Sequence, residues 1–209
     1  MPKEWKGSVV SVDSDRVMVG ETRRKAELGN WQGWQRKVSD VLETGYPNAS
    51  FTHILINFAI FYFQDTNAAL KEFRRMLVPG GIIAFSSPIS IHAMDLINIA
   101  RRDLLDPPPF PLALPAMQSN RITTASDLLQ NNGFDLVVVE EVTYDAPMDN
   151  PKMAAEACSP LVMNVGKGWD EEKQAEVMES LKVICEREWE AGRKEFLQNV
   201  LITVGKKRD

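Results

Sequence analysis

The chain of 209 residues has few of the residue types that build metal and redox sites. It contains two cysteines, Cys158 and Cys185, which form no CxxC pair, and two histidines, His53 and His92. These four residues lack the spacing of zinc ligands and of a disulfide framework, so the sequence predicts no metal site. We expect both cysteines to be inert thiols of a reduced, cytoplasmic protein.

Long apolar runs and clusters of basic residues are also scarce. No apolar run reaches the roughly 18 residues that a membrane-spanning helix needs. The first ten residues, MPKEWKGSVV, lack the apolar core of a secretion signal. The formal net charge is -5, which argues against a nucleic-acid partner. The absence of a GxSxG motif removes support for a serine hydrolase. A small-molecule partner is the remaining expectation, with no nucleic acid and no membrane.

The composition is that of a globular protein, because 44% of the residues are hydrophobic and 25% are charged. A chain of this length can bury a sizeable core, and we expect one domain over 1–209. Within it, 88–122 and 147–196 are expected to be helical or lid-like insertions. The apolar stretch 109–117 would line a substrate pocket or pack on the core.

Strand-like and helix-like stretches alternate along the chain, which is typical of an α/β fold with a parallel sheet covered by helices. The consecutive valines of one predicted strand, 134–142, indicate burial on both of its faces. Another predicted strand ends near Ser86 and Ser87. The predicted strands cover 8–12, a short segment beginning at Val38, 52–57, 82–85, 134–142 and 199–205, and the predicted helices cover 16–28, 67–77, 92–105, 126–132 and 170–189.

Several motifs follow one another in a recognisable order. They are Val9-Val10-Ser11-Val12-Asp13, Val38-Ser39-Asp40-Val41, the apolar run from Phe51 to Ala59 with Asn57, the helix leading into Pro79-Gly80-Gly81, and Val200 to Lys207. In this order they resemble the second, third, fourth, fifth and last strands of class I S-adenosylmethionine-dependent methyltransferases. The resemblance covers 8–90 well, and 123–142 and 199–207 loosely.

The resemblance implies a Rossmann-like, mostly parallel sheet with helices on both faces. The family's first strand, first helix and glycine-rich loop have no counterpart, because the chain starts just before the second strand and contains no GxGxG motif. The family's first strand lies inside the sheet, so its loss would leave a gap or a re-paired sheet. The chain is then a fragment, a protein completed by a homodimer or a partner chain, or a relative that lost the cofactor.

The resemblance also implies the residues that would bind S-adenosylmethionine. Asp13, followed by Ser14, would accept the ribose hydroxyls, as a carboxylate at a strand's carboxyl end does in dinucleotide folds. The alternative is a helix cap, a role that suits Asp15 better. Asp40 would accept from the adenine amino group and Val41 would pack on the ring, unless Asp40 is only a turn residue.

Three further positions are expected around the reacting methyl group. Asn57 and Phe58 end the central strand and would face the methyl group or the substrate, although Asn57 would serve equally well to satisfy loop backbone. His92 is a candidate base for a hydroxyl nucleophile, since its ordinary pKa lies near neutrality. Tyr62 is a candidate for orienting that hydroxyl. His53, inside a strand, is expected to pack or to form a hydrogen bond.

Methyl transfer from S-adenosylmethionine to a small molecule is the leading hypothesis for function. The region from Trp169 to Trp189 loosely resembles fungal secondary-metabolism methyltransferases. Because one fold hosts many functions, two alternatives remain. The chain would be a cyclase or isomerase that has lost methyl transfer, or a non-catalytic subunit of a partner.

Overall fold

The computed structural model describes residues 7–109, 122–166 and 168–209. The apolar stretch 109–117, expected to line a pocket, lies almost wholly outside them. The elements, in chain order, are β1 (Val9–Asp13), α1 (Arg16–Leu28), β2 (Trp34–Val38), β3 (Phe51–Asn57), η1 (Ile60–Tyr62), α2 (Thr66–Met76), β4 (Leu77–Ile91), α3 (His92–Arg102), α4 (Ile122–Asn131), β5 (Phe134–Pro147), α5 (Pro151–Val165), α6 (Glu171–Glu190) and β6 (Glu195–Lys207).

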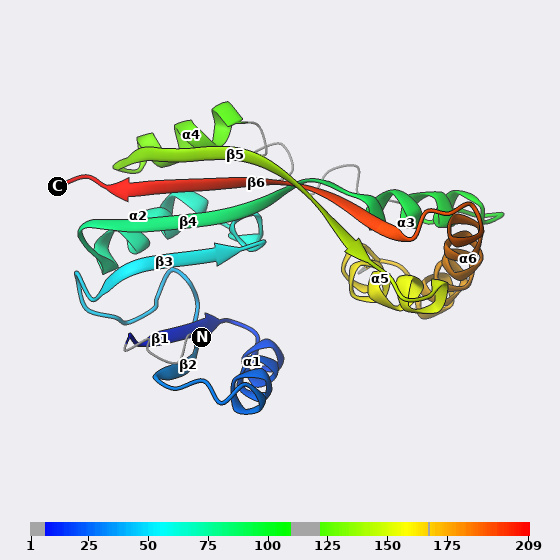
Figure 1. The fold of residues 1–209 in the computed structure, drawn as a ribbon, viewed down its shortest axis with the longest axis horizontal. Helices are drawn as coiled ribbons and strands as arrows, with labels where there is room; N and C mark the ends of the chain where they lie inside the picture. Colours follow the sequence, from blue (N-terminus) through cyan, green and yellow to red (C-terminus); the bar gives the residue numbers. More distant parts are fainter. Residues whose placement is uncertain (1–6, 110–121, 167) are drawn as a thin grey trace.

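The strands form two sheets (Figure 1). β1 and β2 pair in parallel, and the second sheet has the order β3-β4-β6-β5. β3 and β4 are parallel, whereas β6 is antiparallel to both β4 and β5. β3, β4 and β5 therefore point in one direction. The predicted α/β class, with a Rossmann-like sheet flanked by helices, is confirmed.

A gap separates the two sheets. β1 is the strand of the first sheet that lies nearer to β3 (Figure 1), and no strand of the described residues pairs with the facing edge of either. The sequence left open either a gap or a re-paired sheet in place of the family's first strand, and the structure has the gap. Each facing edge therefore presents backbone N–H and C=O groups that a further strand would pair.

The first hydrophobic cluster lies between the four-stranded sheet and two helices, α2 and α4. Asp65 begins α2 by accepting a hydrogen bond from the Ala68 N–H at 2.8 Å. The helix then buries its apolar stripe against the sheet. Gly205 of β6 lets α4 approach closely, because a Cβ there would lie 2.8 Å from Leu129. The buried members include Leu70, Phe73, Met76, Ile83, Phe85, Leu129, Phe134 and Leu201.

The second cluster lies at the far end of the three long strands. β4, β5 and β6 have 15, 14 and 13 residues and continue beyond the first cluster. There α3, α5 and α6 pack around Phe196, and Figure 1 shows them as a separate group of helices. None of the described helices is both long and apolar enough to cross a membrane.

Two sequence expectations about the strands are wrong in detail. Val38 ends β2 and does not begin it, because the strand pairs with β1 from Trp34 onward and the Trp34 indole N–H donates to Ser11 Oγ at 2.8 Å. The valines of β5 are not buried on both faces. Val138 is 38% exposed because it lies on the face that the helices of the first cluster leave uncovered, and Val137 is 55% exposed at the register shift between Leu136 and Val138.

The connection between β2 and β3 is held on α2. Thr44 is buried, and its hydroxyl donates to Glu72 Oε1 at 2.7 Å. Glu72 also accepts two hydrogen bonds from Arg75, each 2.7 Å long. Arg75 in turn donates to Asn48 Oδ1 at 2.7 Å. These contacts attach the small β1–β2 sheet to the larger one.

Leu70→Ala tests the first cluster. Leu70 is fully buried on α2, so the truncation should lower the free energy of unfolding by about 2 to 5 kcal/mol. Urea unfolding followed by circular dichroism measures it. Leu28→Ala is the matched control, since Leu28 is 75% exposed and its loss should change the value by no more than about 0.5 kcal/mol. Equal losses in the two variants would contradict this cluster.

Glu72→Gln tests the loop anchor. Hydrogen bonds from Arg75, aided by Thr44, lower the pKa of Glu72 in the folded protein. A lowered pKa contributes stability above the unfolded value of about 4.3, and that contribution disappears as the pH falls through the folded value. Unfolding free energies measured from neutral pH down to about pH 3 should fall more steeply in the wild type than in Glu72→Gln. Parallel curves would rule the anchor out as a source of stability.

Candidate functional site

Asp13 and Asp40 lie next to one another at the carboxyl ends of the paired strands β1 and β2. The backbone carbonyl of Asp13 accepts a hydrogen bond from the Ser39 N–H at 3.0 Å, so Asp40 follows one residue beyond this contact. Both aspartates are exposed. The Asp40 carboxylate accepts from the Leu42 N–H at 2.8 Å, which fixes its direction at the start of the loop.

The structure separates the roles of the aspartates on either side of Ser14. Asp15 is the N-cap of α1, and its side chain accepts from the Val17 N–H at 2.7 Å. Asp13 Oδ1 accepts from the Asp15 N–H at 2.9 Å. The cap role therefore belongs to Asp15, as the sequence predicted. Asp13 and Ser14 are exposed in the turn between β1 and α1.

Asn57 and Phe58 are joined to β4 through Ser86. The Ser86 hydroxyl donates to Asn57 Oδ1 at 2.6 Å and accepts from the Phe58 N–H at 3.1 Å. Phe58 has a φ of 51°, in the left-handed region that an aromatic residue rarely adopts. The hydrogen bonds hold this conformation, and strained backbone of this kind is often found at functional sites.

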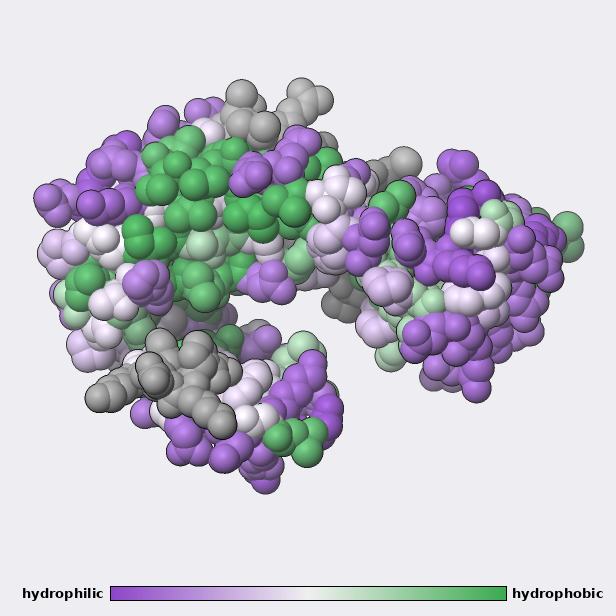
Figure 2. Space-filling model, in the orientation of Figure 1, coloured by the Kyte–Doolittle hydropathy of each residue, from purple (hydrophilic) through white to green (hydrophobic). Residues whose placement is uncertain are grey.

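The strand ends bring these two groups of residues to the same side of the sheets. The arrows of β1 and β3 point in the same direction in Figure 1, so Asp13 and Asn57 both lie at carboxyl ends. Val41 packs on the first hydrophobic cluster, which also contains Ile56 and Ile60. Figure 2 shows an open hollow between the β1–β2 sheet and the larger body.

Tyr62 follows Asn57 by one short turn. It ends η1, whose first residue, Ile60, is 4% exposed and fixes the turn on the core. Tyr62 itself is 53% exposed. The turn therefore presents a phenol to solvent near the carboxyl end of β3.

His92 lies elsewhere. The sequence placed it just after a strand ending at Ser86 and Ser87, but β4 continues to Ile91. Six residues of strand carry His92 roughly 20 Å beyond Ser86, into the second cluster. This extension follows from the pairing of β4 with β6, which runs as far as Ile91. The longer strand separates His92 from Asn57.

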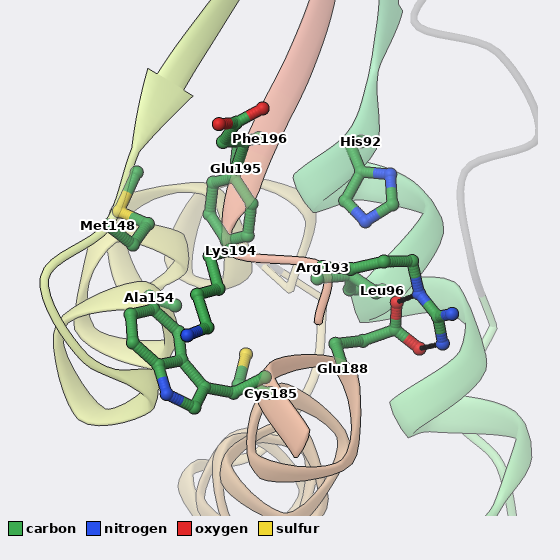
Figure 3. Close-up of a pocket in the computed structure, with 11 residues that line it drawn as sticks. His92, Leu96, Met148, Ala154, Cys185, Glu188, Arg193, Lys194, Glu195 and Phe196 are labelled. Carbon is green, nitrogen blue, oxygen red and sulfur yellow. Dashed lines mark hydrogen bonds and ion pairs between the residues drawn. The ribbon is translucent and has the colours of Figure 1, made fainter. Parts of the chain in front are cut away.

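Figure 3 shows the pocket around His92. The imidazole lies 5.9 Å from the Phe196 ring, between centroids, and Glu188 pairs with Arg193 beside it. Arg193 lowers the pKa of Glu188, with a smaller effect of His92 in the same direction. The cavity volume is about 10 Å³, which is room for about one water molecule. This pocket is too small for a substrate.

The two cysteines belong to the same helical cluster. Burial raises the pKa of the Cys185 thiol to about 11, and burial together with the neighbouring Cys185 raises that of Cys158 to about 12. Both thiols are therefore protonated at neutral pH and are poor nucleophiles.

Two features escaped the sequence reasoning. Ser86 was taken as a strand end, although a polar residue inside an apolar strand is a signal for a hydrogen-bonding partner. The chain also contains one Gly-x-Gly triplet, Gly166-Lys167-Gly168. Gly166 is the C-cap of α5, so this triplet follows a helix, whereas nucleotide-binding glycine loops follow a strand.

Comparisons with known proteins agree with this architecture. A family model described as "Methyltransferase domain" matches residues 1–85. The methyltransferase tpcH of Aspergillus fumigatus is 26% identical over 191 residues, covering 85% of this chain and 66% of the relative. The aklanonic acid methyltransferase DauC of a Streptomyces species is 29% identical over 83 residues, covering 40% of this chain and 38% of the relative. The chain thus spans less than two thirds of either relative's length.

Solved structures show the same fold. An S-adenosylmethionine-dependent methyltransferase from Aquifex aeolicus superimposes with a TM-score of 0.54 and 13% identity, covering 98% of this chain and 71% of the other. The 4+2 cyclase SpnF gives a TM-score of 0.57 and 14% identity, covering 96% and 66%. Residues 1–85 thus match a methyltransferase domain, and the chain as a whole has a fold similar to that of S-adenosylmethionine-dependent methyltransferases.

Proposed function

We propose that this chain takes part in methyl transfer from S-adenosylmethionine to a small-molecule nucleophile. The observation that carries the proposal is the pair of exposed carboxylates, Asp13 and Asp40, at the carboxyl ends of adjacent parallel strands. In open α/β sheets this edge is where nucleotide ligands bind. The similarity to methyltransferases gives the pair a specific ligand, the nucleoside of the cofactor.

The residues present fit the nucleoside half of the cofactor. Asp13 offers carboxylate oxygens to two ribose hydroxyls, with Ser14 exposed beside it. Asp40 can accept from the adenine amino group, while the half-buried Val41 offers an apolar surface to the ring. The described residues contain no glycine-rich strand-to-helix turn for the methionine half. The fit therefore extends to the nucleoside and stops there.

The chemistry needs positioning more than covalent help from the protein. When bound, the cofactor supplies a methyl group on a sulfonium, which is already activated for transfer. The side-chain oxygen of Asn57 accepts a hydrogen bond from Ser86, so the side-chain amide nitrogen of Asn57 is the group that would donate to a ligand. Tyr62 would orient a substrate hydroxyl from the next turn. His92 would act as a base only if the substrate extended to the second cluster.

The relatives support a small molecule as the substrate. DauC is named for aklanonic acid, and tpcH is a fungal methyltransferase. We therefore propose a secondary-metabolism substrate. The fold also occurs in the cyclase SpnF, so a cofactor-independent cyclisation is the second candidate. Product formed without any added cofactor would favour the cyclase, and product formed only with S-adenosylmethionine would favour methyl transfer.

Asp13→Ala and Asp15→Ala test the nucleoside site as a pair. Calorimetric titration with S-adenosylhomocysteine should show binding to the wild type and about 10- to 100-fold weaker binding to Asp13→Ala, because each charge-assisted hydrogen bond to a ribose hydroxyl is worth about 1.5 to 3 kcal/mol. Asp15→Ala should keep the affinity but lose about 1 kcal/mol of stability, because Asp15 caps α1.

Two outcomes would count against the site. The absence of heat with the wild type at millimolar ligand would discard cofactor binding by this chain. A loss of affinity in Asp15→Ala equal to that in Asp13→Ala would show that the turn matters only for folding. Thermal unfolding of both variants separates these cases.

Tyr62→Phe and His92→Ala test the substrate end. With a hydroxyl-bearing substrate identified by a methyl-transfer screen, Tyr62→Phe should lower kcat/KM by about 10-fold through the loss of one hydrogen bond. His92→Ala should change kcat/KM by less than about twofold, given its distance from β3. A large loss of kcat/KM in His92→Ala, with the fold intact by circular dichroism, would assign the base to His92 instead.

A further inference from the structure

The four-stranded sheet has one face that the helices of the first cluster leave open. The register aligns Leu55 of β3, Ala84 of β4, Val204 of β6 and Val138 of β5 in one row across the sheet. Successive residues of a strand point to opposite faces. This row therefore lies on the face opposite Ile83, which is buried in the first cluster.

The exposure of the two faces differs sharply. Leu55 is 77% exposed and Val138 is 38% exposed, whereas Ile83 and Thr203 on the helix-covered face are 0% exposed. Figure 2 shows hydrophobic side chains gathered over the strands on this side. We define the open face by six apolar side chains, which are Leu55, Ile82, Ala84, Val138, Ile202 and Val204.

The size of the open face is that of an interaction site. Four strands about 4.8 Å apart, read over about six residues of about 3.3 Å each, give an area of a few hundred square ångströms. The largest apolar patch on a typical monomer is about this size and is often functional. A flat sheet face is also the shape that packs on another sheet, about 10 Å away.

Charged residues border the open face in a self-complementary pattern. We call the row from Leu55 to Val138 the central row. Lys206 pairs with Ile82, two residues from the central row in one direction along the strands. Two residues in the other direction, Glu140 lies beside Ile202. The central row is therefore midway between a cation and an anion. Asp135, which also pairs with Lys206 across the strands, has its own ion pair with Arg208 at 2.7 Å.

We propose that the open face binds a second copy of this chain, sheet against sheet, around a twofold axis that runs along the row from Leu55 to Val138. This axis reverses the strand direction of the second copy. It places Lys206 of each chain near Glu140 of the other, and it buries the apolar residues between them. A twofold dimer requires such a self-complementary surface.

The charge pattern is what favours a second copy over a foreign partner. An unrelated protein would need only a matching apolar surface, with no reason for opposite charges at equal distances from the central row. The proposed nucleoside site, with Asp13 and Asp40, lies at the carboxyl ends of β1 and β2, outside the open face. Asn57 shares a row with Ile202 and Glu140, so the open face adjoins the substrate end of the site. Dimerisation and binding of the cofactor's nucleoside can therefore fail independently.

Sedimentation velocity of the full chain, over a hundredfold range of micromolar concentrations, tests the proposal. The wild type should show a concentration-dependent species of twice the chain mass. Val138→Lys should raise the dissociation constant at least about 10-fold, because the charge would be buried in the interface. Val17→Lys is the matched control, since Val17 is 75% exposed on α1 and outside the open face.

A charge exchange tests the orientation of the two copies. Lys206→Glu and Glu140→Lys should each weaken association several-fold, and the double variant should restore it. Circular dichroism checks that each variant is folded. If Val138→Lys does not fold, Leu55→Lys is used in its place. A wild type that stays monomeric throughout overturns the dimer. A dimer that persists in both Val138→Lys and Leu55→Lys would rule out this face as the interface. A charge-exchanged double variant that still associates weakly would rule out this orientation.

Discussion

β6 lies between β4 and β5 along most of its length, and the rest of the structure depends on this pairing. Its antiparallel partners run from Ile82 to Ile91 on one side and from Phe134 to Pro147 on the other. Leu201, in its middle, is buried in the first cluster, and Phe196, near its start, is buried in the second. β6 and its two partner strands thus connect the two cores.

The same pairing sets the distance between candidate functional groups. Because β4 stays paired with β6 after Ser86, it carries His92 away from the carboxyl ends of β1 and β3. The Asp13–Asp40 pair and Asn57 remain on the near side. The loop anchored by Thr44 on α2 connects these two groups. The candidate site is therefore assembled from two sheets, held together by a polar contact rather than by a continuous ladder.

The open face and the gap have one physical cause. A parallel sheet of an α/β protein is normally covered by helices on both faces, and each of its inner strands pairs on both edges. In the described residues, the four-stranded sheet receives helix cover on one face, and β1 and β3 face each other unpaired. Leu55 lies on the open face and on β3, the strand at the gap, so its side chain lacks helix cover and its strand lacks a partner on one edge. A second copy of the chain would satisfy the face but not the gap.

The sequence by itself determined the elements with strong local signals. The apolar spacing of α2, the Asp65 cap, the ends of α1 and the strand from 51 to 57 could all be predicted, since they depend on residues a few positions apart. The order of motifs indicated the resemblance to methyltransferases and located Asp13, Asp40 and Asn57 at strand ends. The Asp15 cap was likewise readable from its position before a helix.

Only the tertiary structure decided the length of the strands, the bond between Asn57 and Ser86, and the exposure of the β5 valines. Strand length depends on how far a partner strand continues, and the partner of β4 lies more than a hundred residues away in the chain. Valine favours a strand whether or not a helix covers it, so the open face left no mark on local pattern. Long-range pairing and packing set these features, and local sequence carries no record of them.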